Sequence, residues 1–273
     1  MRRYDVPTSS RWGATTPQPW GVLVLERHAM TPSPVTTKFV VVHSRKGGVG
    51  KTTIAYELAY LLGAPLIDLD WEEGGATRVW GYRWEDRTRS SLLTALERGE
   101  TPRLLSGHNK PDLLPGHPAF ELAQPMANDM ADALAKWAGE WAREWVVIDT
   151  HPGATEATNG ALAVAHVVVA PVPLATKDLN GTEALVRDLA DYPLVLVPNK
   201  IQPIPPAAEI ARLRGIVAGT PVQVGPPIPR AIAVETRKKR MAITSENPPA
   251  KPLRPVDLAL RELAQFVKEY TNG

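Results

Sequence analysis

The residues whose chemistry is most evident form a glycine-rich stretch, Lys46-Gly47-Gly48-Val49-Gly50-Lys51-Thr52-Thr53. An apolar, β-branched run at 39–43 precedes it and predicts a buried strand, and apolar residues at helical spacing follow it and predict a helix. Glycines between a strand and a helix let backbone N–H groups close around phosphate oxygens, and the helix start adds a positive dipole end. We therefore expect Lys51 to reach the outer phosphates of a nucleotide and the Thr52 hydroxyl to bind Mg²⁺.

This stretch departs from the strict phosphate-loop pattern G-x-x-x-x-G-K-[ST], because Arg45 stands where that pattern has its first glycine. It resembles the deviant Walker A motif of the ParA/MinD superfamily, which has a second lysine at the front of the loop. The resemblance implies that this lysine, here Lys46, contacts the phosphates of a nucleotide held by a second copy of the chain. ATP and ADP as ligands, Mg²⁺ as the metal and a nucleotide-dependent homodimer are the corresponding expectations.

Two aspartates end apolar runs further along the chain. Asp70 closes the run 65–70, and Asp149 closes the run 145–149. The carboxyl ends of parallel strands meet at one edge of a sheet, so both carboxylates should face the phosphate loop. The resemblance implies that Asp70 orients the attacking water near Mg²⁺ and that Asp149 holds Mg²⁺ in a Walker B arrangement. For Asp68 we expect a structural hydrogen bond at the strand end.

The chain departs from the family pattern after each aspartate. It continues as Asp70-Trp-Glu-Glu-Gly where the family has Asp-Pro-Gln-Gly, and His151 stands at the first proline of Asp-[Thr/Ser]-Pro-Pro-Gly. His151 is either a γ-phosphate sensor or an ordinary loop histidine. The resemblance also implies that Asn199, after the strand at 194–198, hydrogen-bonds adenine. Lys200 either stacks beside the base or is a solvated charge.

Strand patterns near residues 39, 66, 146, 167, 194 and 222 alternate with helical patterns. This alternation predicts an α/β fold, a single doubly wound and mostly parallel sheet with helices on both faces, as in P-loop NTPases. Residues 38–273 would form one ATPase domain, since the resemblance covers about 38–270. Residues 1–37, rich in Pro, Ser and Thr, read as a flexible N-terminal extension without its own core.

Composition excludes several other classes of site. The 273 residues include no cysteine, which rules out disulfides, Fe–S clusters and thiolate metal sites and fits a cytoplasmic protein. The sequence has no apolar run long enough to span a membrane. The formal net charge is only +2, yet residues 201–273 carry eleven Lys or Arg and six Asp or Glu. Such a basic segment on an acidic body suggests a polyanion surface.

The candidate DNA-binding residues lie in this basic part: Arg230, Arg237, Lys238, Lys239 and Arg240. The resemblance implies that they bind nonspecific DNA, and a solvated charged face is the alternative. Residues 75–110 are rich in arginine and tryptophan, which either stack on bases or pack a helical cap.

The resemblance favours a small ParA-type DNA-partition ATPase without an N-terminal helix-turn-helix domain. Its dimer would bind DNA and associate with the nucleoid when ATP is bound. A ParB-like, centromere-binding partner would stimulate its slow hydrolysis. One alternative is an ATPase of the same type that positions a protein cargo. Another is a metabolic ligase that resembles dethiobiotin synthetase. A membrane-cycling ATPase is disfavoured, because the last helical pattern, 255–270, has a polar face of mixed charge.

Overall fold

The computed structural model describes residues 36–73 and 75–272. In this part, seven strands form one parallel sheet in the order β3-β2-β4-β1-β5-β6-β7. The strands are β1 Lys38–Val42, β2 Leu66–Asp68, β3 Leu113–Leu114, β4 Trp145–Asp149, β5 Val167–Pro173, β6 Leu194–Asn199 and β7 Gln223–Val224. The predicted doubly wound α/β sheet is therefore confirmed, and the predicted strand near 222 is the two-residue edge strand β7.

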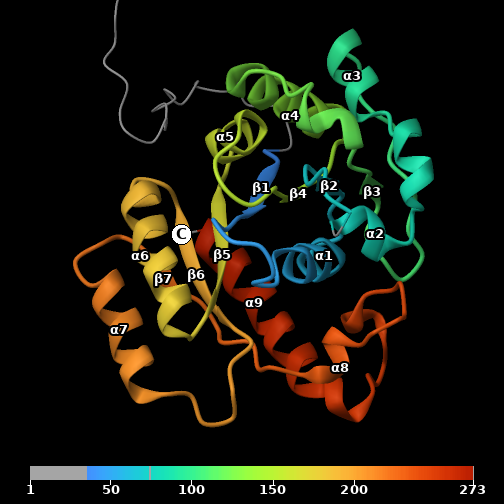
Figure 1. The fold of residues 1–273 in the computed structure, drawn as a ribbon. Coiled ribbons are helices and arrows are strands. Elements are labelled where there is room, and N and C mark those ends of the chain that lie inside the picture. Colours follow the sequence, from blue (N-terminus) through green and yellow to red (C-terminus); the bar gives the residue numbers. More distant parts are fainter. Residues whose placement is uncertain (1–35, 74, 273) are drawn as a thin grey trace, which may run out of the picture.

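Helices connect the strands and cover both faces of the sheet (Figure 1). The α-helices are α1 Lys51–Leu61, α2 Ala76–Trp80, α3 Leu92–Arg98, α4 Ala127–Trp141, α5 Glu156–Ala163, α6 Thr176–Leu189, α7 Ala207–Val217, α8 Ile232–Glu235 and α9 Arg254–Asn272. Short 3₁₀ turns are η1 Trp84–Arg89, η2 Pro118–Glu121, η3 Ile243–Ser245 and η4 Lys251–Leu253. None of these helices is both long and apolar enough to cross a bilayer.

The core consists of two layers, because successive side chains of a strand point to opposite faces. In β1, Phe39 and Val41 pack with α3–α7, whereas Val40 and Val42 pack with α1 and α9. Burial on both faces explains why the central strands are continuous apolar runs. Because both faces of the central strands are buried, their carboxyl ends are held in place. These ends form the edge of the sheet that carries the predicted site.

The boundaries differ from expectation in one functionally relevant place. The run 65–70 predicts a strand up to Asp70, but β2 ends at Asp68. Asp70 therefore lies in a loop beyond the sheet edge. The predicted extension 1–37 lies almost entirely outside the described residues, which begin at 36.

Candidate functional site

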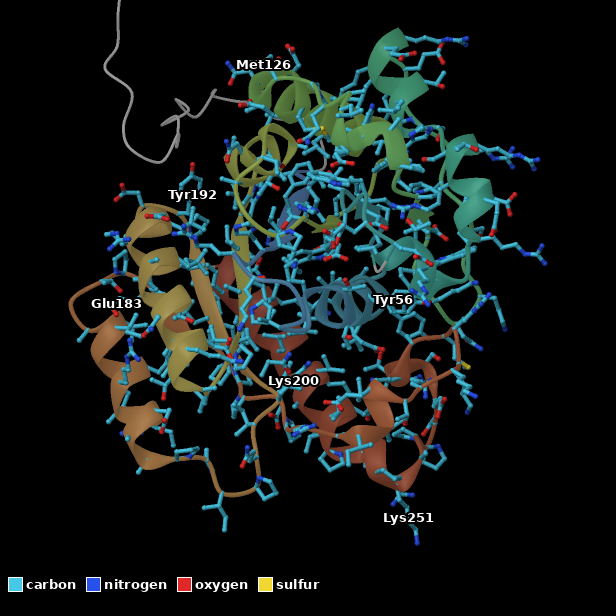
Figure 2. All side chains as sticks on the ribbon, in the orientation of Figure 1. Tyr56, Met126, Glu183, Tyr192, Lys200 and Lys251 are labelled. Carbon is cyan, nitrogen blue, oxygen red and sulfur yellow. The ribbon has the colours of Figure 1, made fainter. Side chains whose placement is uncertain are left out.

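The glycine-rich loop joins β1 to α1 at the carboxyl edge of the sheet (Figure 1). Gly48 and Gly50 have φ angles of 76° and 102°, a left-handed region that suits glycine. The side-chain amide of Asn199 donates to the Val49 carbonyl at 2.7 Å, and Lys200 Nζ donates to the Gly48 carbonyl at 2.9 Å. The end of β6, where Lys200 is labelled in Figure 2, thus braces the loop. The adenine contact of Asn199 stays a prediction.

Lys51 begins α1 and is enclosed, with only 6% of its surface exposed. Burial lowers the pKa of Lys51, while the nearby carboxylates of Asp149 and Asp70 act in the opposite direction. The first turn of α1 contains no acidic residue, so its positive dipole end is not offset by a carboxylate. An enclosed ammonium group at a helix start is suited to phosphate oxygens.

Asp149 ends β4 in register with Val42 of β1 and Asp68 of β2. Its carboxylate is fully buried, and neither oxygen makes a hydrogen bond of ordinary geometry with a described residue. Burial raises its pKa well above the usual value, and Asp68 adds to this effect. Lys51 and the Thr52 hydroxyl favour the charged form instead.

These features fit a hard divalent cation. Two buried carboxylate oxygens without a hydrogen bond of ordinary geometry are costly unless a cation approaches them. The described residues contain no cluster of three or more His, Asp or Glu that could cage a metal. Mg²⁺ does not need such a cage, since it keeps water and phosphate oxygens as ligands. Asp149 and Thr52 are the residues best placed to hold it, with Asp70 nearby.

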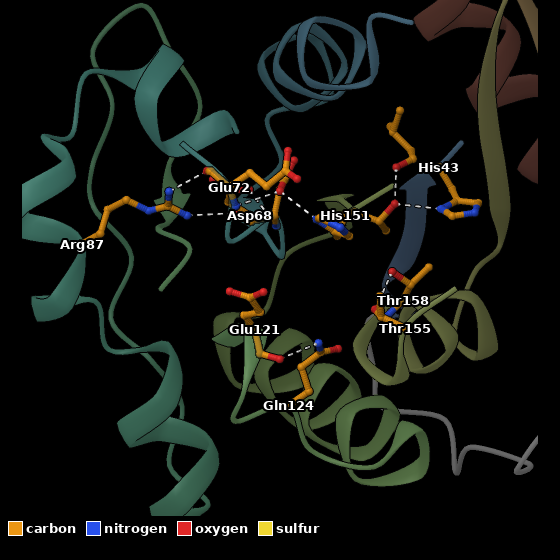
Figure 3. A network of polar contacts seen from close by, with 12 residues as sticks. His43, Asp68, Glu72, Arg87, Glu121, Gln124, His151, Thr155 and Thr158 are labelled. Atoms are coloured by element: carbon orange, nitrogen blue, oxygen red, sulfur yellow. Dashed lines mark hydrogen bonds and ion pairs between the residues drawn. The ribbon is translucent and has the colours of Figure 1, made fainter. Parts of the chain in front are cut away.

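Arg87 and His151, both labelled in Figure 3, hold the loop that contains Asp70. Arg87, only 1% exposed, donates to the carbonyl oxygens of Asp70 and Glu72, each at 2.7 Å. His151 Nδ1 lies 3.1 Å from Asp70 Oδ1, which also accepts from the Glu72 backbone N–H at 3.0 Å. The loops after β2 and β4 therefore meet at the Asp70 carboxylate.

Asp68 has the structural role that its position predicted. It accepts hydrogen bonds from the Thr77 backbone at 2.7 Å and from the Asp70 backbone at 3.1 Å. Burial raises the pKa of Asp68 to about 6, although the Thr77 bonds oppose this. The contacts tie the start of α2 to the end of β2.

Lys46 stands at the front of the loop and faces outward. Its side chain is 54% exposed and forms an ion pair with Asp178 in the first turn of α6. The adjacent Arg45 pairs at 2.6 Å with Asp188, near the end of the same helix. The two loop lysines therefore differ in environment: Lys51 is enclosed, and Lys46 is held at the surface by α6.

A cavity of about 280 Å³ lies beside the loop, between α5 and α6. His43 lines it, and burial lowers the pKa of this histidine to about 3. The Thr150 hydroxyl donates to the Val42 carbonyl, so His43 must donate from Nδ1 to Thr150, at 2.9 Å. His43 Nε2 is then an acceptor.

The basic segment, residues 237–240, is partly neutralised within the fold. Arg237, whose side chain is 12% exposed, pairs with Glu246 at 2.8 Å, and Lys239 pairs with the same carboxylate at 2.9 Å. Arg230 pairs at 3.3 Å with a glutamate of α8. Arg237 thus contributes to packing in this conformation, whereas Lys239 stays 63% exposed.

Arg240 and Lys110 meet at the end of α2, although they lie far apart in sequence. Arg240 donates to the Gly81 carbonyl at 3.3 Å, and Lys110 donates to the Trp80 carbonyl at 3.0 Å. The Lys110 ammonium also lies 3.4 Å from the centre of the Trp80 ring. Partial burial and the nearby Arg240 lower the pKa of Lys110. Both cations bond to backbone carbonyls and keep further donors, which suits a phosphate-bearing ligand.

Sequence reasoning did not identify three residues of this arrangement: Asp178, Arg87 as a loop clamp, and Glu57. Of these three, only Glu57 could have been noticed in the sequence. It is a charged residue on the apolar face of α1, three residues after Ile54. It is buried and accepts from the backbone N–H groups of Ile243 at 2.7 Å and Thr244 at 3.1 Å. The residues just after the basic segment are thereby tied to α1, the helix that follows the glycine-rich loop.

Comparison with known families gives one match, to the AAA domain family over residues 37–193. No curated protein sequence matches the chain. Many solved structures share the fold.

Three of these structures illustrate the range of proteins that share the fold. A variant of Cyanothece McdA in complex with ATP is 18% identical, with 86% of this chain and 96% of that chain covered and a TM-score of 0.67. A putative plasmid partition protein from Borrelia burgdorferi B31 bound to AMPPNP is 18% identical, with 85% and 99% covered and a TM-score of 0.66. Cobyrinic acid a,c-diamide synthase from Mycobacterium smegmatis, with ADP and magnesium, is 24% identical, with 87% and 96% covered and a TM-score of 0.64.

Proposed function

The chain belongs to the AAA domain family and fits the ParA/MinD superfamily of ATPases, and from this premise we propose that it is a DNA-partition ATPase. A homodimer would enclose Mg·ATP, bind nonspecific DNA and hydrolyse ATP slowly. A ParB-like protein bound to centromere DNA would stimulate hydrolysis and release the dimer from DNA. The observation that carries the proposal is the pair of loop lysines, one enclosed and one exposed at the loop front.

The nucleotide chemistry follows from the residues around the loop. Backbone N–H groups of residues 47–53 and the Lys51 ammonium would bind the phosphates. Bound Mg²⁺ would supply charge neutralisation for the transferring phosphoryl group. Asp70 would orient the attacking water, because its loop lies beside the end of β4. Phosphoryl transfer to water needs positioning and charge stabilisation more than a strong base, which agrees with slow unstimulated turnover.

Lys46 would link nucleotide binding to dimerisation. Lys46 is exposed and pairs with the carboxylate of Asp178. Phosphate oxygens of a nucleotide held by a second subunit could take the place of this carboxylate. A charge-assisted hydrogen bond contributes roughly 1.5–3 kcal/mol, and a symmetric dimer would gain two. Lys46→Ala should therefore abolish ATP-dependent dimerisation.

The DNA surface would combine the basic segment with the cations at the end of α2. Lys238, Lys239, Arg240 and Lys110 offer donors there, whereas Arg237 is largely occupied by Glu246. Dimerisation would double this surface and raise the affinity for DNA without creating a new site. The ATP-bound protein would then associate with the nucleoid.

A mobility shift on random duplex DNA with ATP, ADP or no nucleotide tests the proposal. We expect a shift with ATP and Mg²⁺ that weakens steeply with salt, because bound cations release counterions from DNA. Equal binding with ADP, or none with ATP at low salt, would refute a nucleotide-controlled DNA motor. A protein cargo would be indicated if the ATP dimer bound DNA but its genomic neighbour encoded no centromere-binding protein.

A second candidate function, a metabolic synthase, is favoured by the cavity beside the loop. Polar groups of His43, Arg45 and Asn159 line this cavity together with leucines of α5 and α6. The similar fold of the cobyrinic acid a,c-diamide synthase agrees with such a use of the scaffold. In that case, a small carboxylate substrate would stimulate ATP consumption, and DNA would not.

A further inference from the structure

The two departures from the family sequence pattern touch each other in the fold. The rings of Trp71 and His151 stack, with centroids 3.7 Å apart and planes inclined by 13°. Trp71 belongs to the loop after β2, and His151 belongs to the loop after β4. Trp71 also packs against the core beneath α3–α7. The stack therefore connects two loops that are remote in sequence and anchors them to the core.

His151 directs one oxygen of the Asp70 carboxylate. Oδ1 faces His151 Nδ1 at 3.1 Å and accepts from the Glu72 N–H at 3.0 Å. A carboxylate oxygen can only accept, so the imidazole must carry its proton on Nδ1. Asp70 Oδ2 makes no hydrogen bond with any residue in the described part of the chain. Two donors thus fix Oδ1 and leave Oδ2 for a water molecule.

We propose that His151 is a positioning residue for Asp70, and that Trp71 sets the plane of its imidazole. The stack and the hydrogen bond make residues 70–72 and 150–153 one unit, so that neither loop shifts without the other. Arg87 supports the same unit, because it donates to the carbonyl oxygens on both sides of Trp71. This inference rests on the proposed function, in which Asp70 orients water during ATP hydrolysis.

Three variants of His151 separate positioning from packing. His151→Ala should lower kcat about ten- to a hundredfold with KM for ATP nearly unchanged, since a misplacement of about 1 Å can cost roughly 100-fold. His151→Asn should recover most of the rate, because its amide N–H can occupy the place of Nδ1–H. His151→Gln places its amide nearer the position of Nε2 and should not. Equal rates for all three variants would overturn the positioning role, as would a wild-type rate for His151→Ala.

Hydrogen exchange of the nucleotide-free protein tests the coupling of the loops without reference to activity. Trp71→Ala should speed exchange at residues 150–153, and His151→Ala should speed it at the Glu72 amide, each by about tenfold or more. Trp141→Phe and the exposed His108→Ala serve as controls and should change neither segment. If replacement in one loop leaves exchange in the other unchanged, the inference is wrong. Absence of any ATPase activity in the wild type would refute the proposed function, and the exchange experiment would still decide the coupling.

Discussion

Removing the negative charge of Asp178 should strengthen ATP-dependent dimerisation. In the isolated chain, Lys46 is paired with Asp178. In the proposed dimer, each Lys46 would have to leave this carboxylate to reach the nucleotide phosphates held by the second subunit, so two such pairs would break. Asp178→Asn removes the charge but keeps a polar side chain of similar size in the first turn of α6.

The size of the effect follows from the exposure of the pair. The side chains are 54% exposed for Lys46 and 12% for Asp178, and solvent screens such a pair substantially. Ion pairs of this kind contribute about 0.2–1 kcal/mol each. Two pairs correspond to about 0.4–2 kcal/mol, or roughly a 2- to 30-fold lower dimer dissociation constant for the variant.

Sedimentation velocity with Mg²⁺ and a non-hydrolysable ATP analogue measures this constant. Asp188→Asn is the matched control, because it removes the same charge from the same helix. The native Asp188 pairs with Arg45 rather than with Lys46. Lys46→Ala should prevent dimerisation, and adding Asp178→Asn to it should change nothing further. The reasoning fails if Asp178→Asn dimerises no better than Asp188→Asn, or if it rescues Lys46→Ala.

Three further outcomes follow from buried contacts and from charge. Gly50→Ala should abolish nucleotide binding by calorimetry, because its φ is 102° and its Cβ would collide with the Asn199 amide. Burial raises the pKa of Glu57, so its contribution to the free energy of unfolding is fully present below about pH 4.5 and is lost as the pH rises through the folded-state pKa. Glu57→Gln should flatten that decline in urea unfolding measured across pH, and an unchanged pH profile would contradict the assignment. Lys110→Gln should reduce the slope of log K for DNA against log salt by about 0.9. Lys251→Gln, which changes an exposed residue of η4 (Figure 2), should leave the slope unchanged.

The sequence indicated most of the fold because its signals are local. Phe39–Val42 and Val167–Val169 are continuous apolar runs, which only a strand buried on both faces requires. Their alternation with helical periods allows few arrangements other than a parallel, doubly wound sheet. The edge strand β7 was harder to delimit, since only its Gln223 and Val224 pair and both are exposed.

The same distinction between local signals and tertiary packing holds for the candidate site. The glycine-rich loop, Asp70 and Asp149 could be placed at the carboxyl edge of the sheet from the sequence, because each lies at or just beyond the end of a strand. Their roles in the site stay predictions. Their immediate partners could not be placed from the sequence. The bond of His151 to Asp70 and the clamp of Arg87 depend on where separate loops pack, which no short pattern records.

The sequence by itself thus determined the parallel sheet, the glycine-rich loop between β1 and α1, and the position of two acids at or just beyond the ends of β2 and β4. Neighbouring residues along the backbone specify each of these features. Only the tertiary structure decided that Lys46 pairs with Asp178, that Arg237 is taken up by Glu246, and that Lys110 lies beside Arg240. The physical reason is distance along the chain: side-chain ion pairs and hydrogen bonds form only where packing of the core brings remote segments together.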